Sequence, residues 1–447
     1  MTRKNENPLT VGFISLGCPK NTVDSERMLA EIAQAGFLIV PDPEQADAVV
    51  INTCGFIAPA RLEAYQFIKD ALGWKKAGGV KKVIIAGCLV QRMGAELLDE
   101  FPQIDALLGL GQRDDIANVI TETFKSAQHK SYLGHNDSFV NDRVRLRTGP
   151  AHWSYLRISE GCDHNCSFCT IPAIRGPFRS KPLNQIIDEA NELVDSGSVE
   201  LNIIAQDTTS YGRDLKIKHG LAHLLTQLQS LPRLAWLRLM YLYPVGITNQ
   251  LIETIAAADK VVHYFDMPIQ HVSDPILKNM HRPDTKKKIY DCISRLRQNF
   301  PDCVLRTTLI VGFPGETDSQ FAELLDFIRE TGFDALGCFK YYPESGTAAA
   351  EMPDQIPDEI KEQRVNNLML AQQQIAFEKN NRLIGKKLTC LVDSIQPDGS
   401  AHARYFGQAP EIDSLCILER CSVPTGTFIK AKVTGSRDYD LLIKQIS

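Results

Sequence analysis

Long apolar runs and an excess of basic charge are both missing from this sequence of 447 residues. No stretch of about 18 apolar residues occurs, so the sequence offers no candidate for a membrane-spanning helix. The 49 Lys and Arg residues are outnumbered by 54 Asp and Glu residues, which argues against an enzyme that must hold a large polyanion through its phosphates. With 44% hydrophobic residues the chain can bury an ample core, and its length predicts about three domains.

The regular spacing of a disulfide scaffold is missing too, although the chain has 12 cysteines. In a chain of this size we expect reduced thiols in the cytoplasm, with metal binding as their favoured use. The segment Leu9–Cys18 resembles a short lipoprotein signal, but its apolar part is barely long enough and Ser15 stands where such signals favour Leu. We therefore interpret this segment as a buried strand.

Three cysteines lie within eight residues in the sequence CDHNCSFC, at Cys162, Cys166 and Cys169, and we call them the loop cysteines. A [4Fe–4S] cluster normally takes four thiolates, so three thiolates from one tight loop leave one iron open to a ligand that is not protein. The CxxxCxxC spacing differs from the paired CxxC halves of a structural zinc site. We therefore predict that the loop cysteines are iron ligands. The alternative, a chance gathering of buried thiols, is disfavoured by the polar residues of this loop.

A second set of three cysteines follows three apolar, β-rich segments near the N-terminus. The segment ISLGC ends at Cys18, INTCG contains Cys54, and IIAGC ends at Cys88; we call these the edge cysteines. Helical patterns separate the segments, which predicts a parallel sheet with crossover helices. Since ligands of such sheets bind beyond the carboxyl ends of the strands, we expect the edge cysteines to meet at one edge of the sheet. Taken singly, each would more often be a buried apolar side chain.

The rest of the chain predicts a linker and two further domains. We expect Asp24 or Ser25 to cap the helix that follows the first strand. The polar segment Lys125–Pro150 is interpreted as a linker, and the pattern Pro357–Gly385 predicts a long connecting helix. Strand–helix units between them predict a partial (β/α) barrel, whose chemistry lies at the carboxyl ends of its strands. The strands expected beyond the linker are Trp153–Ile158, Val199–Ala205, Leu234–Leu239, His263–Met267, Val304–Val311, Leu336–Tyr341, Leu388–Ser394, His402–Tyr405 and Thr427–Thr434.

The predicted fold class is therefore α/β, in three parts. An N-terminal parallel α/β domain is expected at residues 8–125, a partial (β/α) barrel at 145–380, and a small C-terminal antiparallel β-barrel at 381–447. The last part carries nine basic and seven acidic residues. Such a balance suits a protein ligand at least as well as RNA.

This combination resembles the radical SAM (S-adenosylmethionine) methylthiotransferases, in which a methylthiotransferase N-terminal domain precedes a radical SAM barrel and a TRAM domain. The resemblance covers nearly the whole chain. The tRNA-modifying branch of that family, the MiaB type, typically differs around the first cysteine and after the radical SAM loop. Four segments resemble instead the branch acting on ribosomal protein S-twelve, the RimO type: SLGCPKNTVDSERML (Ser15–Leu29), INTCGFI, ISEGCDHNCSFCTIPAIRGPFRSKP and QAPEID (Gln408–Asp413).

The resemblance implies insertion of a methylthio group at the β-carbon of one aspartate of that small-subunit protein. An sp³ C–H bond is a poor target for polar chemistry, so a radical cofactor has to perform the difficult step. By the resemblance, a [4Fe–4S] cluster on the loop cysteines reduces one SAM to methionine and a 5′-deoxyadenosyl radical, which removes the β-hydrogen. A second [4Fe–4S] cluster on the edge cysteines holds the sulfur, and a second SAM supplies the methyl group.

The resemblance also suggests residues that contact SAM, and it assigns no general acid or base. We expect His164 to face solvent or a backbone carbonyl, and His271 to be a satisfied structural histidine. The candidates at two strand ends, for the polar groups and the adenine of SAM, are Gln206, Asp207, Ile310, Gly312, Pro314 and Gly315. The cysteines interpreted as packing residues are Cys292, Cys303, Cys338, Cys390, Cys416 and Cys421.

Two other functions remain open on the sequence. A methylthiotransferase acting on an adenosine of tRNA would share every cysteine and differ in its surfaces and in the short segments quoted above. A non-catalytic iron–sulfur protein, such as an electron carrier, would normally use four cysteines per cluster. For the favoured function we expect ribosomal protein S-twelve as partner, free or in the small subunit, and an electron donor such as flavodoxin or ferredoxin. We expect a cytoplasmic monomer with no membrane partner.

Overall fold

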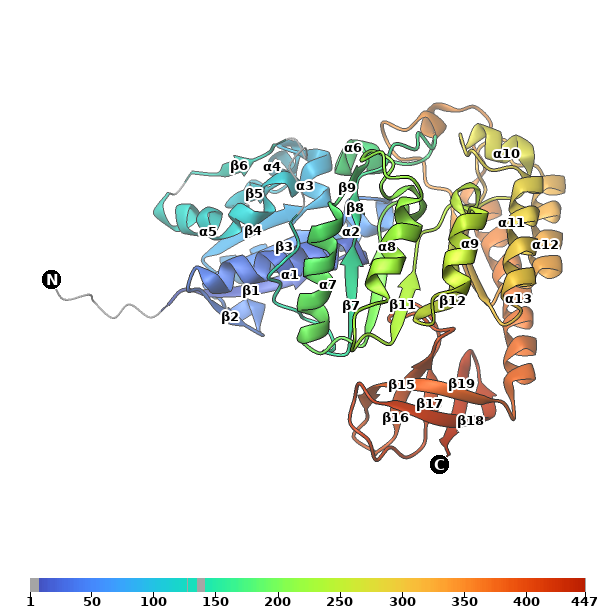
Figure 1. Ribbon diagram of the computed structural model, residues 1–447. Helices are drawn as coiled ribbons and strands as arrows, with labels where there is room; N and C mark the ends of the chain where they lie inside the picture. Colours follow the sequence, from blue (N-terminus) through green and yellow to red (C-terminus); the bar gives the residue numbers. More distant parts are fainter. Residues whose placement is uncertain (1–7, 127, 135–140, 447) are drawn as a thin grey trace. The chain divides into compact units, whose positions relative to one another are not determined.

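A computed structural model describes residues 8–126, 128–134 and 141–446 of the chain (Figure 1). The chain forms two compact units, which we describe one at a time. The first holds the residues up to Thr148 together with Glu160–Asp163 and Cys169–Lys181, and the second holds Gly149–Ser159, His164–Phe168 and the chain from Pro182 onward. Within the described ranges, no helix combines the length and the apolar character needed to cross a membrane.

The first unit is built on a parallel sheet of six strands in the order β2-β1-β3-β4-β5-β6. The strand order reverses between β1 and β3, which is the topological switch point where open α/β sheets bind ligands. The strands are β1 (Thr10–Ser15), β2 (Leu38–Val40), β3 (Ala48–Thr53), β4 (Lys82–Gly87), β5 (Ala106–Leu108) and β6 (Lys130–Tyr132). The helices of this unit are α1 (Pro19–Gln34), α2 (Ala58–Lys76), α3 (Cys88–Met93), α4 (Glu96–Glu100), α5 (Ile116–Lys125) and α6 (Ile171–Arg175).

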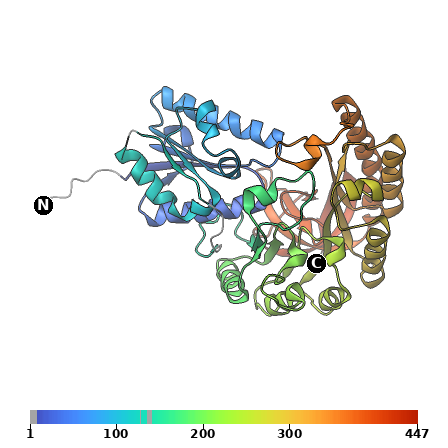
Figure 2. The ribbon, with the colours of Figure 1, turned by 90° about the horizontal axis from the view of Figure 1, so that it is seen from above.

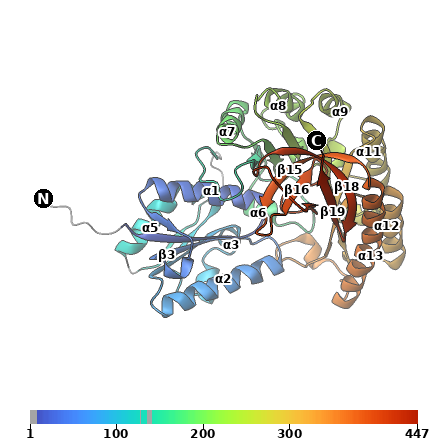
Figure 3. The same ribbon diagram turned by 90° about the horizontal axis from the view of Figure 1, so that it is seen from below.

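Helices cover both faces of this sheet, with α1 and α5 on one side and α2 on the other (Figure 3). Successive residues of a strand point to opposite faces, so the buried strands are apolar over most of their length, although β3 ends in the buried polar residues Asn52 and Thr53. In β3, Val50 packs in the core that contains α1 and α5, whereas Ile51 packs in the core that contains α2. Two separate cores therefore fix the register of the sheet and the positions of the strand ends.

Three details of the first unit differ from the sequence prediction. Helix α1 begins at Pro19, so Asp24 and Ser25 are buried inside the helix and do not cap it. Proline suits the first helical position because its missing N–H is not needed there. The segment Lys125–Pro150 is not only a linker, since β6 pairs in parallel with β5. The short strands β2 and β5 were missed as well, and residues 135–140 of the expected linker lie outside the described residues.

The second unit contains a parallel sheet of six strands in the order β14-β13-β12-β11-β10-β7, which is an open, partial (β/α) barrel. Its helices lie in an arc outside the strands (Figure 2). The strands are β7 (Trp153–Arg157), β10 (Glu200–Ile204), β11 (Trp236–Leu239), β12 (Val261–Gln270), β13 (Val304–Val311) and β14 (Ala335–Lys340). The helices are α7 (Leu183–Asp195), α8 (Gly220–Leu228), α9 (Asn249–Ala256), α10 (Asp274–Asn279), α11 (Lys286–Asn299), α12 (Asp318–Thr331) and α13 (Asp358–Leu383). The short strands β8 (Ser159–Glu160) and β9 (Arg179–Ser180) flank the cysteine loop in the chain.

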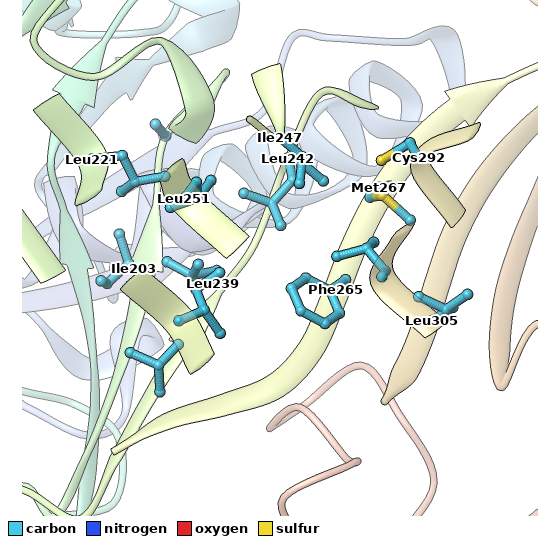
Figure 4. Close-up of a cluster of buried hydrophobic side chains, with 14 of the residues drawn as sticks. Ile203, Leu221, Leu239, Leu242, Ile247, Leu251, Phe265, Met267, Cys292 and Leu305 are labelled. Atoms are coloured by element: carbon cyan, nitrogen blue, oxygen red, sulfur yellow. The ribbon is translucent and has the colours of Figure 1, made fainter. Parts of the chain in front are cut away.

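One apolar core joins these strands to the helices outside them (Figure 4). Ile203, Leu239 and Phe265 come from three neighbouring strands and are almost fully buried against side chains such as Leu221 of α8 and Leu251 of α9. Cys292, Cys303 and Cys338 lie in or against the same core, as expected of packing residues. The core holds the strands parallel, so their carboxyl ends lie together at one end of the partial barrel.

The C-terminal part of the second unit is a closed barrel of five strands in the order β15-β16-β17-β19-β18. Its pairs are antiparallel except for β17 with β19, which run parallel and were not predicted from the sequence. Cys390 and Cys416 are buried in its core, and Cys421 packs against that core. The strands are β15 (Lys387–Ile395), β16 (Ala401–Tyr405), β17 (Cys416–Leu418), β18 (Phe428–Arg437) and β19 (Asp440–Gln445).

A network of buried charges fastens this small barrel to the parallel strands of the same unit. Arg404 of β16 approaches Glu200 of β10 to 2.9 Å and Asp393 of β15 to 2.6 Å. Glu200 also pairs with Arg238 of β11, and His152 reaches Asp393 at 2.8 Å. Arg404, Glu200 and Arg238 are at most 1% exposed. Each charge therefore depends on its partners, because an unpaired ion at such a position is costly.

The QAPEID segment contributes to the same contact. The Glu411 carboxylate accepts a hydrogen bond from the Tyr155 hydroxyl at 2.9 Å. Asp413 accepts one from Tyr264 at 2.7 Å and lies 3.4 Å from Arg306. This short segment, which resembles a family signature in the sequence, therefore serves to attach the C-terminal barrel.

We expect Arg404→Met to destabilise the attachment by about 3–5 kcal/mol, because Glu200 and Asp393 would lose their buried cation. Trp236 reports this contact, since its ring lies 4.8 Å from the ring of Phe428 in the small barrel. The measurement is urea unfolding followed by Trp236 fluorescence, in a chain whose other two tryptophans are replaced by phenylalanine.

The matched control is Arg382→Met. Arg382 forms an exposed i,i+4 ion pair with Glu378, and such pairs contribute only about 0.3–0.5 kcal/mol. Equal losses of stability in the two variants would contradict the role assigned to Arg404.

Candidate active site

The edge cysteines follow the central strands of the first unit. Cys18 lies just beyond β1 as the N-cap of α1, Cys54 directly follows β3, and Cys88 directly follows β4. Since β1, β3 and β4 are neighbours and parallel, all three cysteines lie at the carboxyl edge of the sheet. Cys18 is exposed, Cys54 is half-buried and Cys88 is buried.

Local geometry brings these three cysteines near one another, but their side chains do not converge on the position of a single metal ion. Gly17 has a φ of +98°, and a Cβ added there would lie 2.9 Å from the Cβ of Cys54, so the first two cysteine loops touch. Burial raises the pKa of the Cys88 thiol to about 12; the nearby Arg175 opposes this shift, and the thiols of Cys18 and Cys54 add to it. In the described chain, no three His, Cys, Asp or Glu side chains converge closely enough to hold a single metal ion. Three thiol donors at one sheet edge match the number that a [4Fe–4S] cluster with one open iron takes from the protein.

Buried charges stand behind Cys88. Arg175 is 2% exposed and places Nη2 3.2 Å from the Cys88 Sγ. The same guanidinium pairs with Glu160 at 3.0 Å and with Asp24 at 3.1 Å, and Asp24 also binds Arg113 at 2.6 Å. Sequence reasoning missed Arg175, although it lies in the quoted segment that follows the loop cysteines.

The cysteine loop is fastened on the first unit through its own backbone and side chains. The Cys162 N–H donates to the Gly176 carbonyl at 3.1 Å, and Asp163 Oδ1 accepts from the Phe178 N–H at 2.8 Å. Gly161 has a φ of +78°, and a Cβ there would lie 2.1 Å from the Pro177 carbonyl oxygen. Only glycine therefore fits directly before Cys162.

The other part of the loop, His164–Phe168, belongs to the second unit and contacts residues at its strand ends. Tyr243, just beyond β11, has its hydroxyl 4.0 Å from the Cys166 Sγ. The His164 ring stacks on Tyr243 with centroids 4.1 Å apart, and the Arg282 guanidinium lies 4.1 Å from the centre of the same ring. Neither Tyr243 nor Arg282 was chosen from the sequence, and the position of Tyr243 beyond a strand end was the available signal.

His164 also corrects a prediction. Its Nε2 lies 2.7 Å from the Asp207 carboxylate, so its hydrogen-bond partner is a carboxylate and not a backbone carbonyl, while the side chain stays 21% exposed. Burial raises the pKa of Asp207, but hydrogen bonds from His164, Ser210 and Thr209 outweigh this and lower it overall. Asp207 is thus an ionised, buried anchor for the cysteine loop, and its neighbour Gln206 is half-buried at the end of β10.

The other SAM candidates are Ile310, near the end of β13, and Gly312, Pro314 and Gly315 in the turn that follows this strand. The backbone N–H groups of Gly312 and Phe313 donate to Glu316 Oε2, the second at 3.1 Å. Arg364 of α13 lies 3.2 Å from the other oxygen of Glu316, which fixes that carboxylate. The ion pair between Glu316 and Arg364 therefore supports this turn, and neither residue was selected from the sequence.

His271, just beyond β12, is only partly satisfied as a structural histidine. Its Nδ1 accepts from the Ser273 N–H at 3.0 Å, whereas the buried Nε2 has no hydrogen-bond partner among the residues that the structure describes. Burial, with a smaller effect of Arg364, lowers the pKa of His271 to about 3. The ring is therefore neutral at physiological pH.

Three family descriptions match parts of the chain. "Radical SAM superfamily" matches residues 156–328, "Uncharacterized protein family UPF0004" matches residues 10–109, and "TRAM domain" matches residues 384–446. The chain is 43% identical to the ribosomal protein uS12 methylthiotransferase RimO of Geobacter sulfurreducens over 98% of each chain. It is also 43% identical to the protein of the same name from Clostridium acetobutylicum, over 97% of each chain. The chain belongs to the RimO family of radical SAM methylthiotransferases.

Solved structures agree with a radical SAM fold. The radical SAM methyltransferase TsrM from Kitasatospora setae, with a tryptophan substrate and a SAM analog bound, superimposes with a TM-score of 0.55 at 14% identity, covering 87% of this chain and 79% of that chain. OxsB, a cobalamin-dependent SAM radical enzyme, superimposes with a TM-score of 0.52 at 12% identity, covering 82% of this chain and 56% of that chain. At these identities the likeness concerns the fold, which this RimO family member shares. Membership of a radical SAM family also brings SAM and [4Fe–4S] clusters as the cofactors.

We expect His271 to make the fold sensitive to mild acid. The pKa of His271 is lowered in the folded chain, so below about pH 6.5 the unfolded chain binds a proton at this residue that the folded chain does not bind. The free energy of unfolding therefore falls as the pH falls from about 6.5 toward 3. Between pH 6.5 and 5 this amounts to about 2 kcal/mol. Urea unfolding at a series of pH values measures it.

His271→Gln should flatten that pH dependence, whereas His223→Gln, at an exposed position of α8, should leave it unchanged. Identical slopes for the wild type and His271→Gln would contradict the assignment.

Proposed function

We propose that this protein transfers a methylthio group to the β-carbon of an aspartate in ribosomal protein uS12, the protein called S-twelve above. The observation that carries the proposal is the presence of two three-cysteine sets, one in a tight loop and one at a sheet edge, in a chain that resembles uS12 methylthiotransferases over 98% of its length. A reaction that needs both a radical source and a sulfur donor accounts for both sets.

We assign the loop cysteines and the edge cysteines as the ligands of two [4Fe–4S] clusters. When bound, these clusters and SAM supply the radical, the sulfur and the methyl group, so no protein side chain has to attack the C–H bond. The protein's contribution is to hold three thiolates per cluster and leave one iron open. No side chain is assigned as a general acid or base.

Several side chains would orient these groups. The His164–Asp207 contact and the stacking of His164 on Tyr243 hold the cysteine loop against the strand ends of the second unit. We assign to the adenine of SAM Ile310, near the end of β13, and Gly312, Pro314 and Gly315 in the braced turn after it. Gln206 is assigned to the polar part of SAM; Asp207 keeps that assignment too, although its carboxylate already anchors His164, Ser210 and Thr209.

One observation favours a partner that carries phosphate groups. In the C-terminal barrel, Lys432 lies directly opposite Lys387 on one side and Lys444 on the other, and all three are exposed. Asp393 and Asp413 are engaged in attaching the barrel, so its outer face is more basic than the balanced count suggests. Phosphate binding needs clustered lysines of this kind. The row suits uS12 within the assembled small subunit, and it keeps a tRNA substrate as the second candidate.

We further propose a cytoplasmic enzyme that acts as a monomer and receives electrons from a flavodoxin or ferredoxin. The three parts of the chain are assigned to residues 8–125, 145–380 and 381–447, as the methylthiotransferase, radical SAM and TRAM domains. A substrate that is made and assembled in the cytoplasm supports that location.

The test is anaerobic incubation of the cluster-loaded protein with SAM and a reductant. The substrates are a peptide spanning the uS12 target loop, intact small subunits and tRNA, each in a separate reaction. Mass spectrometry should find one hydrogen replaced by CH₃S on the aspartate of the peptide or of the assembled protein. Modification of tRNA alone would overturn the uS12 assignment and establish the second candidate.

Replacing the loop cysteines and replacing the edge cysteines should affect different steps of the reaction. Replacing all three loop cysteines by alanine should abolish 5′-deoxyadenosine formation, whereas replacing all three edge cysteines should preserve it and abolish methylthio transfer. Each variant should keep about half of the iron, because one of two four-iron clusters remains. Cys421→Ala, at a packing position of the C-terminal barrel, is the control and should change neither activity nor iron content. Full iron content in either triple variant would contradict the ligand assignment.

A further inference from the structure

Arg175 stands out among the buried charges of the first unit because it touches a cysteine. It is the last residue of α6, the short helix that follows the loop cysteines in the chain. Its Nη2 lies 3.2 Å from the Sγ of Cys88, within the range of an N–H···S hydrogen bond. A cationic donor that approaches a cluster ligand stabilises negative charge on the sulfur.

The guanidinium is held in this position by three further side chains. Nη1 donates to both carboxylate oxygens of Glu160, at 3.1 and 3.0 Å. Nη2 donates to Asp24 at 3.1 Å and lies 3.4 Å from the Asn21 amide oxygen. The donor is therefore preorganised toward Cys88, since planar, multiply bonded arginines have little freedom to turn away.

We propose that Arg175 sets the reduction potential of the cluster held by the edge cysteines. The inference rests on the proposed function, which makes Cys88 a ligand of that cluster. Reduction adds an electron to the iron–sulfur group, and hydrogen bonds to its sulfurs together with the local charge decide how favourable that is. Arg175 supplies both and so raises the potential. It is a positioning residue that acts through Cys88 and need not touch the substrate.

Arg113 provides a natural comparison. It is also buried and also binds Asp24, at 2.6 Å, and its guanidinium pairs with the Asp142 carboxylate at 2.8 Å. Removing either arginine deletes one positive charge from the same network, but only Arg175→Gln also removes the bond to sulfur. The difference between the two variants isolates that bond.

The experiment uses the full chain with its loop cysteines replaced by alanine, so that only the edge-cysteine cluster is bound. Redox titration followed by electron paramagnetic resonance gives the potential of this chain and of the same chain carrying Arg175→Gln, Arg175→Lys or Arg113→Gln. We expect Arg175→Gln to lower the equilibrium constant for reduction of the cluster about tenfold, which corresponds to a reduction potential lower by about 59 mV for one electron. Arg175→Lys should give a smaller decrease in potential, and Arg113→Gln a minor one.

A potential that is unchanged in both Arg175 variants would overturn the proposal, as would an equal decrease in Arg113→Gln. If Arg175→Gln fails to fold or to bind iron, Arg175→Lys decides, because it keeps the positive charge while changing the hydrogen-bond geometry. Absence of iron and sulfide from the starting chain is a different result: it would refute the assignment of the edge cysteines and therefore the proposed function.

Discussion

Parallel hydrogen bonding between neighbouring strands is the constraint on which both candidate sites depend. In the first unit, β3 pairs with β1 on one side and with β4 on the other, so the residues that follow the three strands share one edge. Cysteines at those positions are gathered by the sheet, although they are far apart in the sequence. In the second unit the same rule places Asp207, Tyr243 and His271, which follow β10, β11 and β12, at one edge of the sheet.

Buried charge is the second organising feature, and each unit uses it differently. In the second unit, Arg404, Glu200 and Arg238 attach the C-terminal barrel to the parallel strands. In the first unit, Arg175 and Asp24 lie directly behind an edge cysteine. Apolar packing could provide comparable stability at such positions, since buried ion pairs are weak stabilisers. What the charged pairs add is a fixed orientation of the side chains. In the first unit they also place a positive charge beside the Cys88 thiol.

The C-terminal barrel shows why a charge count is a poor guide to a surface. Asp393, Glu411 and Asp413 are engaged in contacts within the second unit, whereas Lys387, Lys432 and Lys444 stand in one exposed row across three strands. Like charges directly opposite one another destabilise a sheet, so the row costs stability unless a partner neutralises it. Phosphate groups beside the target protein would do so.

Short-range sequence patterns were enough to predict the local features of this protein. The CxxxCxxC loop, the parallel α/β pattern and the separate C-terminal barrel follow from short-range spacing and periodicity, which is why most of their strands were predicted near their observed positions. These patterns missed the strands β2, β5, β6, β8, β9, β17 and β19, whose pairing depends on distant neighbours, and they placed the start of α1 too late. The side chains that meet became apparent only in the folded chain: His164 with Asp207, Glu316 with Arg364, and Arg175 with Cys88. These pairs are separated by tens of residues, and charge and hydrogen-bonding groups carry no periodicity that would reveal their partners before the chain is folded.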